Sequence, residues 1–105
     1  MTTGSLDWPR DKIAAFCLRW QVSELAVFGS ALRGELRPDS DVDLLITFLP
    51  TATWGLLDHV QMKQELTGIL GREVDLVTRR GVERSHNPVR RKAILSSAES
   101  VYVAR

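Results

Sequence analysis

Cysteine is almost absent from this sequence. The one thiol, Cys17, cannot form an internal disulfide, and no spacing of cysteine and histidine predicts a zinc site. A reducing compartment is the simpler expectation, and we predict a cytoplasmic protein. Residues 1–7 lack the basic stretch and apolar run of a signal peptide. No apolar run approaches the ~20 residues that span a bilayer, so no membrane association is expected.

Neither sign of charge dominates. The chain holds 14 Lys and Arg against 13 Asp and Glu, a net charge of +1, so overall charge gives no argument for nucleic-acid binding. Hydrophobic residues make up 44%, which is enough to bury a core. A length of 105 residues predicts a single domain over 1–105, with residues 1–6 expected to be flexible.

The apolar periodicity predicts helices that alternate with strands. Helices are expected over 8–20, 55–70 and 88–98, a short helix or turn over 31–36, strands over 25–28, 42–48 and 73–77, and a polar loop over 79–86. Residues 100–104 can add a final strand. The predicted fold class is therefore α/β (α+β-like), a small mixed sheet of three to four strands flanked by helices.

The predicted helices carry apolar faces. Ile13, Phe16, Cys17 and Trp20 recur at helical spacing, which favours a buried, unreactive thiol. Leu56, Val60, Met62, Leu66, Ile69 and Leu70 share an arc of the second helix, and Val89, Ala93 and either Ile94 or Leu95 are expected to face inward from the last. His59 falls within the second arc. Because no second ligand accompanies it, a partly buried histidine with a hydrogen-bond partner is expected.

Two aspartates carry the first chemical signal. Asp41 and Asp43 are spaced i and i+2 at the start of the strand predicted over 42–48, so their side chains are expected to share a face. Their mutual repulsion is costly unless a cation neutralises it, and such a pair suits Mg²⁺ or Mn²⁺. The alternative is a solvent-facing strand edge with no bound ion.

Gly29 and Ser30 follow a predicted buried strand. A glycine there lets backbone N–H groups approach an anion, and the Ser30 hydroxyl can donate to a phosphate oxygen. The alternative is an ordinary turn that ends the strand.

Asp75 is the third candidate carboxylate. It lies between Val74 and Leu76 on a short predicted strand and faces opposite to both. If that strand lies beside the Asp41–Asp43 strand, three carboxylates can hold two divalent ions about 3.5–4 Å apart, as in nucleotidyl transfer. The alternative is a polar side chain on an amphipathic strand.

Together these motifs resemble the DNA polymerase β-like nucleotidyltransferase superfamily. The motifs lie in residues 28–35, 38–45 and 71–76. More narrowly, the chain resembles the minimal nucleotidyltransferases (MNT) that accompany HEPN-domain toxins. The resemblance runs from the Ile13–Trp20 helix to Tyr102. Family members often have Arg-Ala where this chain has Ala31-Leu32, so one basic group near the turn is missing.

The resemblance implies a role for each site residue. Gly29 and Ser30 would hold the β- and γ-phosphates of a nucleoside triphosphate, and Arg33 and Ser40 would lie near them. Asp41 and Asp43 would bind two Mg²⁺ ions. Asp75 would bind the catalytic ion and help to deprotonate the acceptor hydroxyl. The implied reaction moves AMP from ATP to a hydroxyl group and releases pyrophosphate.

The acceptor is expected to be another protein. Few residues follow the third strand, so no separate acceptor-binding domain is expected. The resemblance implies a HEPN-type toxin as partner, with this chain as its antitoxin. A non-catalytic antitoxin that masks its toxin, and a small-molecule nucleotidyltransferase, are the alternatives.

A basic cluster lies near the C-terminus. It comprises Arg79, Arg80, Arg84, Arg90, Arg91 and Lys92, with Glu83 as its acidic member. It can contact an acidic toxin face, nucleotide phosphates or RNA, or it can be a solvated surface. RNA is the weakest of these because no aromatic residues are interleaved, so direct nucleic-acid binding is not expected.

Overall fold

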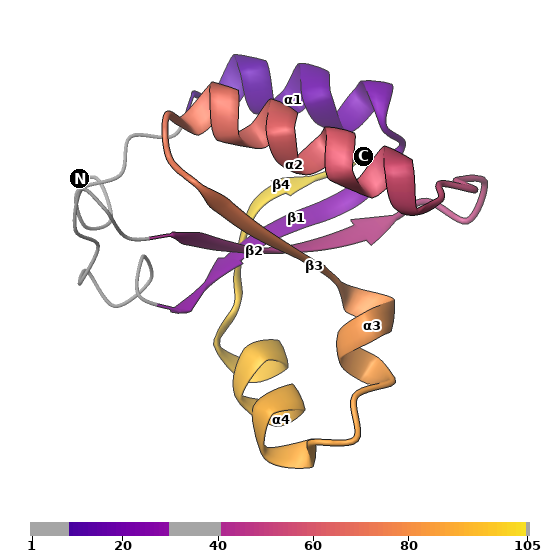
Figure 1. The fold of residues 1–105 in the computed structure, drawn as a ribbon, viewed down its shortest axis with the longest axis vertical. Helices are drawn as coiled ribbons and strands as arrows, with labels where there is room; N and C mark the ends of the chain where they lie inside the picture. The colour runs from indigo at the N-terminus through magenta and orange to yellow at the C-terminus, as the bar shows by residue number, and fades with distance from the viewer. Residues whose placement is uncertain (1–8, 30–40, 105) are drawn as a thin grey trace.

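One mixed β-sheet organises the chain (Figure 1). The computed structural model describes residues 9–29 and 41–104. The elements in order are α1 (Arg10–Arg19), β1 (Val22–Phe28), β2 (Val42–Phe48), α2 (Leu56–Leu70), β3 (Val74–Thr78), α3 (Arg79–Glu83), α4 (Pro88–Ser97) and β4 (Glu99–Val103). The strand order is β3-β2-β1-β4, with β2 and β3 parallel and the other pairs antiparallel. This confirms the predicted mixed sheet with flanking helices.

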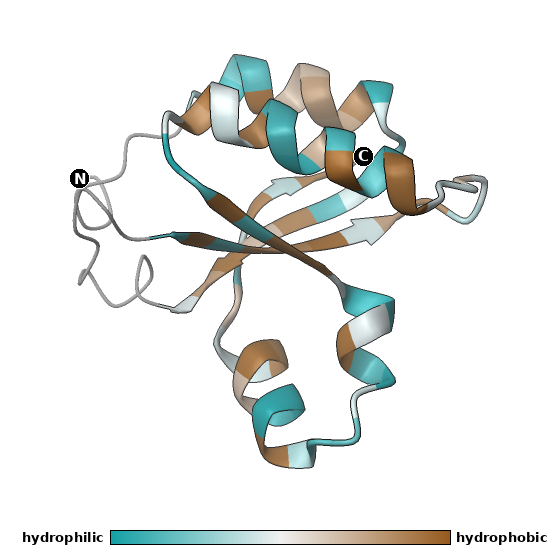
Figure 2. Cartoon of the chain, in the orientation of Figure 1, coloured by the Kyte–Doolittle hydropathy of each residue, from teal (hydrophilic) through white to brown (hydrophobic). Residues whose placement is uncertain are grey.

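Helices cover both faces of the sheet (Figure 1). Side chains of a strand alternate between faces, so each strand contributes to two cores. Val42, Leu44 and Ile46 are buried in the core that also contains α1 and α2 residues. Leu45 is buried on the opposite face with Val82 and Ile94, in the core beneath α3 and α4. Figure 2 shows the hydrophobic residues running along the strands between these two layers.

Residues 79–86, which were predicted as a loop, contain the helix α3, and that prediction was wrong. The Thr78 hydroxyl accepts a hydrogen bond from the Gly81 N–H at 3.0 Å and caps the helix. The cap lies at the last residue of β3, so a strand and a helix meet without the connecting loop that the polar composition suggested. Strand β1 also begins at Val22 rather than residue 25, because Val22 pairs with Phe48.

Only the middle and end of helix α2 are buried against the sheet, whereas the apolar arc predicted burial from its first turn. Met62 and Leu66 are fully buried, whereas Leu56 is 79% exposed and Val60 is 44% exposed. His59 Nε2 lies 2.9 Å from the Leu76 carbonyl oxygen, which confirms a partly buried histidine with a partner. The first turn of α2 therefore presents leucines to solvent.

Helix α4 also leaves part of its predicted apolar face exposed. Val89 is 78% exposed and Ala93 is exposed as well, while Ile94 is buried. The Asn87 side chain caps α4 by accepting a hydrogen bond from the Arg90 N–H at 3.1 Å. Within the part of the chain that the structure describes, no helix has both the length and the apolar character needed to cross a membrane.

Cys17 is fully buried on α1, and burial raises the pKa of its thiol to about 12 from an ordinary 9.0. We expect a soluble thiol reagent at pH 8 to react about a thousand-fold more slowly with the native protein than with the urea-unfolded protein, since thiolate is the reactive form. Because the unfolded thiol ionises first, the free energy of unfolding should fall as the pH rises above about 9. Equal labelling rates would contradict this burial.

Candidate active site

Asp43 and Asp75 occupy matched positions on neighbouring strands. They are register partners in the parallel ladder between β2 and β3. Register partners point to the same face of a sheet, and the strands lie about 4.8 Å apart. That face is the one that carries Leu45 and Val77, beneath α3 and α4. The conditional prediction that the two strands are adjacent is therefore confirmed.

The backbone fixes this alignment at the beginning of both strands. The Val42 N–H donates to the Glu73 carbonyl oxygen at 2.9 Å. Val42 and Val74 are register partners, and both are buried in the core that also contains α1 and α2 residues. Their burial holds the two strands against that core. Asp41 lies one residue before β2 and is exposed, as Asp75 is, while Asp43 is half-buried.

Gly29 lies directly against the Asp43 carboxylate. Its neighbour Phe28 is the register partner of Asp43, and Gly29 itself has a φ of +77°. A Cβ atom added to Gly29 would lie 2.2 Å from Asp43 Oδ2. Sequence reasoning gave Gly29 a role toward phosphate but missed this contact. The glycine is required here both by its left-handed backbone and by the carboxylate packed on it.

The donor chemistry of these residues suits a hard divalent cation. Carboxylate oxygens are the ligands that Mg²⁺ takes from proteins. Across residues 9–29 and 41–104, no group of three or more His, Cys, Asp or Glu side chains is placed to hold a metal ion. Asp43 and Asp75 are aligned as register partners. Among the residues that the structure describes, they do not form a three-ligand group with Asp41, so joint metal binding by all three carboxylates stays a prediction.

Ser30, Arg33 and Ser40, together with the predicted 31–36 helix or turn, lie outside the described residues. Of the basic cluster, Arg79 forms exposed ion pairs within the chain. Its side chain is 3.2 Å from Glu83 and 4.0 Å from Glu24, and this links α3 to β1.

Comparison with known proteins places this geometry in a family. Residues 10–101 match the nucleotidyltransferase domain family. A Methanocaldococcus jannaschii protein provisionally named a protein adenylyltransferase is 36% identical over 90 residues, covering 86% of this chain and 90% of that protein. The solved structure of a provisionally named minimal nucleotidyltransferase is 41% identical, with a TM-score of 0.66 over 86% of each chain.

The same fold occurs in a solved toxin–antitoxin complex. The complex contains a tri-AMPylated HEPN toxin from Shewanella oneidensis together with an MNT antitoxin. The TM-score is 0.60 over 90% of this chain and 70% of the matched chain. At 18% identity this likeness shows the fold.

Gly29→Ala should destabilise the protein, because the new Cβ atom meets the Asp43 carboxylate and the φ is left-handed. We expect a loss of about 1–3 kcal/mol in the free energy of unfolding, measured by urea denaturation. Gly68→Ala is the matched control, since a Cβ atom on this helical glycine meets nothing within 4 Å. The control should be stabilised by up to about 1 kcal/mol. A neutral effect at Gly29 would contradict the packing described.

Proposed function

This chain belongs to the nucleotidyltransferase domain family, and we propose that it moves AMP from ATP to a hydroxyl group on a partner protein, a HEPN-type toxin, as the antitoxin of that toxin. The matched positions of Asp43 and Asp75 beside Gly29 carry the proposal. The 36% identical relative, named a protein adenylyltransferase, supports AMP as the transferred group. The MNT antitoxin with the same fold supports a HEPN protein as the acceptor.

In this proposal Asp41, Asp43 and Asp75 hold divalent ions, Mg²⁺ or Mn²⁺. Ions bound there would neutralise charge on the phosphoryl group and activate the attacking hydroxyl. The chain itself positions the carboxylates that would hold these ions. The parallel register fixes Asp43 beside Asp75, and Gly29 leaves room for the Asp43 side chain. Catalysis of this type depends mainly on such positioning and on electrostatic stabilisation.

The proposed reaction transfers AMP to a hydroxyl oxygen of the acceptor. The acceptor oxygen attacks the α-phosphorus of ATP, and a new P–O bond forms. The bond between the α-phosphorus and the oxygen that bridges to the β-phosphate breaks, and pyrophosphate leaves. The hydroxyl proton passes to Asp75, which is exposed on the face it shares with Asp43. Gly29, Ser30, Arg33 and Ser40 are proposed to hold the triphosphate at the end of β1.

The proposal is tested with labelled ATP, Mg²⁺ and the product of the neighbouring gene, which the proposal requires to be a HEPN protein. Label should appear on the HEPN protein, and Asp43→Asn or Asp75→Asn should lower its rate of appearance by about 10²–10³-fold, the scale for losing a group that stabilises transition-state charge. Chelation of Mg²⁺ with EDTA should abolish it.

Asp11→Asn is the matched control, because it removes an exposed carboxylate on α1, on the opposite face of the sheet. Circular dichroism should show that all three variants are folded. A stable complex that never carries label would instead indicate an antitoxin that only masks its toxin. Equal rates for Asp75→Asn and Asp11→Asn would remove Asp75 from the site.

A further inference from the structure

A cavity of about 730 Å³ wraps around the free edge of β3. Among the residues that the structure describes, β3 is the last strand of the sheet on this side, so residues from both faces reach the opening. Leu56 and His59 contribute from α2, and Val82 and Ile94 contribute from α3 and α4. The volume lies within the range of protein ligand sites, about 300–1,000 Å³.

The cavity combines an apolar floor with a positive rim. Val82 and Ile94 are buried within it, and they supply the floor. His86, Arg90 and Arg91 line the rim, and no Asp or Glu is among the described residues that line the cavity. Neither arginine forms an ion pair within the described parts of the chain; Arg91 donates to the Ser85 carbonyl oxygen at 3.2 Å.

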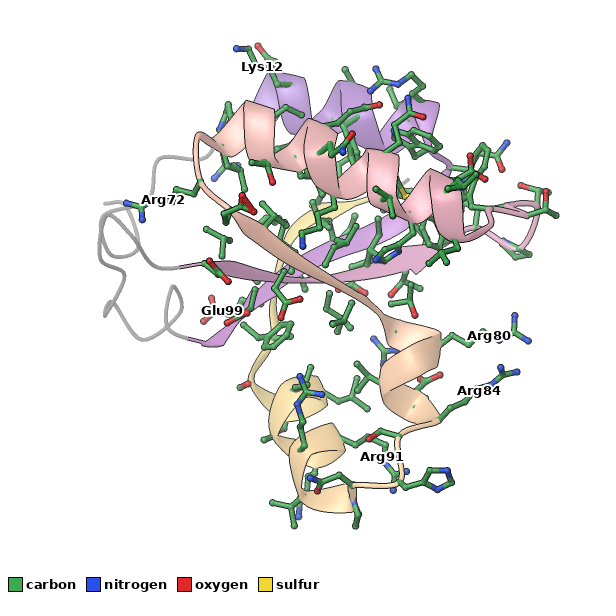
Figure 3. All side chains as sticks on the ribbon, viewed as in Figure 1. Lys12, Arg72, Arg80, Arg84, Arg91 and Glu99 are labelled. Carbon is green, nitrogen blue, oxygen red and sulfur yellow. The ribbon has the colours of Figure 1, made fainter. Side chains whose placement is uncertain are left out.

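Beyond the rim, the exposed surface is also apolar and basic. Leu56 and Leu57 are 79% and 83% exposed at the start of α2, where Figure 2 shows a hydrophobic first turn. Figure 3 shows Arg80 and Arg84 projecting outward from the α3 side. Apolar side chains beside a basic patch are complementary to a protein segment that carries apolar and acidic side chains.

The cavity also adjoins the candidate active site. Val77 lines it, and Val77 is two residues along β3 from Asp75 on the same face. Two residues of strand span about 6.6 Å. A segment held in the cavity therefore lies within a few side-chain lengths of Asp75.

We propose that this cavity at the β3 edge is the docking site of the acceptor protein, and that it takes a segment with an apolar side chain flanked by carboxylates. The inference rests on the proposed function and names the surface through which the acceptor is held. The acidic side chains pair with Arg90 and its neighbours, and the apolar side chain enters between Leu56 and Ile94. The ATP phosphates remain at the other end of β3, beside Gly29 and Asp43.

Two substitutions on the rim test this docking site. Arg90→Glu reverses an exposed charge, and Leu56→Ser removes an exposed apolar side chain. Each should weaken binding of the neighbouring gene's product, the HEPN protein that the proposed function requires, by roughly tenfold, measured by biolayer interferometry without ATP. Wild-type affinity should fall as NaCl rises, and that of Arg90→Glu should fall less steeply because one of the attractive charges is reversed.

The matched controls are Lys12→Glu and Leu18→Ser on α1. Leu18 is 72% exposed, and Figure 3 shows Lys12 on the opposite side of the molecule from Arg84 and Arg91. Both controls should bind as the wild type does. With labelled ATP, the rim variants should raise KM for the HEPN protein and leave KM for ATP unchanged.

Three outcomes separate this inference from the proposed function. Rim-dependent binding without transfer of label would sustain the docking site and overturn AMP transfer. Transfer of label with equal affinity in rim and control variants would overturn the docking site alone. A raised KM for ATP with unchanged affinity for the HEPN protein would assign the cavity to the nucleotide and overturn the inference.

Discussion

Two carboxylates on neighbouring parallel strands set the constraint on which this molecule depends. Like charges at matched positions repel each other, so pairing of the two strands must keep Asp43 and Asp75 aligned. The hydrogen bond from the Val42 N–H to the Glu73 carbonyl oxygen fixes the first pair of the ladder. A shift of β3 by one residue in its pairing with β2 would turn Asp75 toward α1 and α2. It would also remove the buried side chains of Val74 and Leu76 from the core that contains α1 and α2 residues. The apolar residues of β3 therefore enforce the register that aligns the carboxylates.

The sheet has a hydrophobic core on each face, and the two cores differ in size. Helices α1 and α2 fill one face of the sheet with fully buried side chains such as Phe16, Met62 and Leu66. On the other face α3 and α4 form a smaller core around Leu45 and Ile94, and the Asp43–Asp75 pair lies on this face. The smaller core leaves a cavity at the β3 edge, and in the proposed docking mode this cavity gives the acceptor a route toward the aligned carboxylates. The larger core thus lies on one face of the sheet, and the aligned carboxylates lie on the other.

The sequence predicted local features well and long-range ones conditionally. Alternation around Asp43 and Asp75 predicted both strands, but only pairing of the strands could show that the two residues are partners. The close packing of Gly29 on Asp43 joins residues fourteen positions apart, and no local pattern reports it. The sequence pattern also failed to predict that Leu56 is exposed. An apolar arc shows which side chains share one face of a helix, but it does not show how far the sheet extends beneath that face. Helix α3 was missed because its cap, Thr78, belongs to a strand.

The central claim is that aligned carboxylates on β2 and β3 bind divalent cations together with a nucleotide. Titration of Mn²⁺, followed by electron paramagnetic resonance, measures this directly in the presence of a non-hydrolysable ATP analogue. The account predicts two bound Mn²⁺ ions per chain with the analogue present. It also predicts loss of tight binding in both Asp43→Asn and Asp75→Asn. Binding of Mn²⁺ and analogue with wild-type affinity in either variant would contradict it.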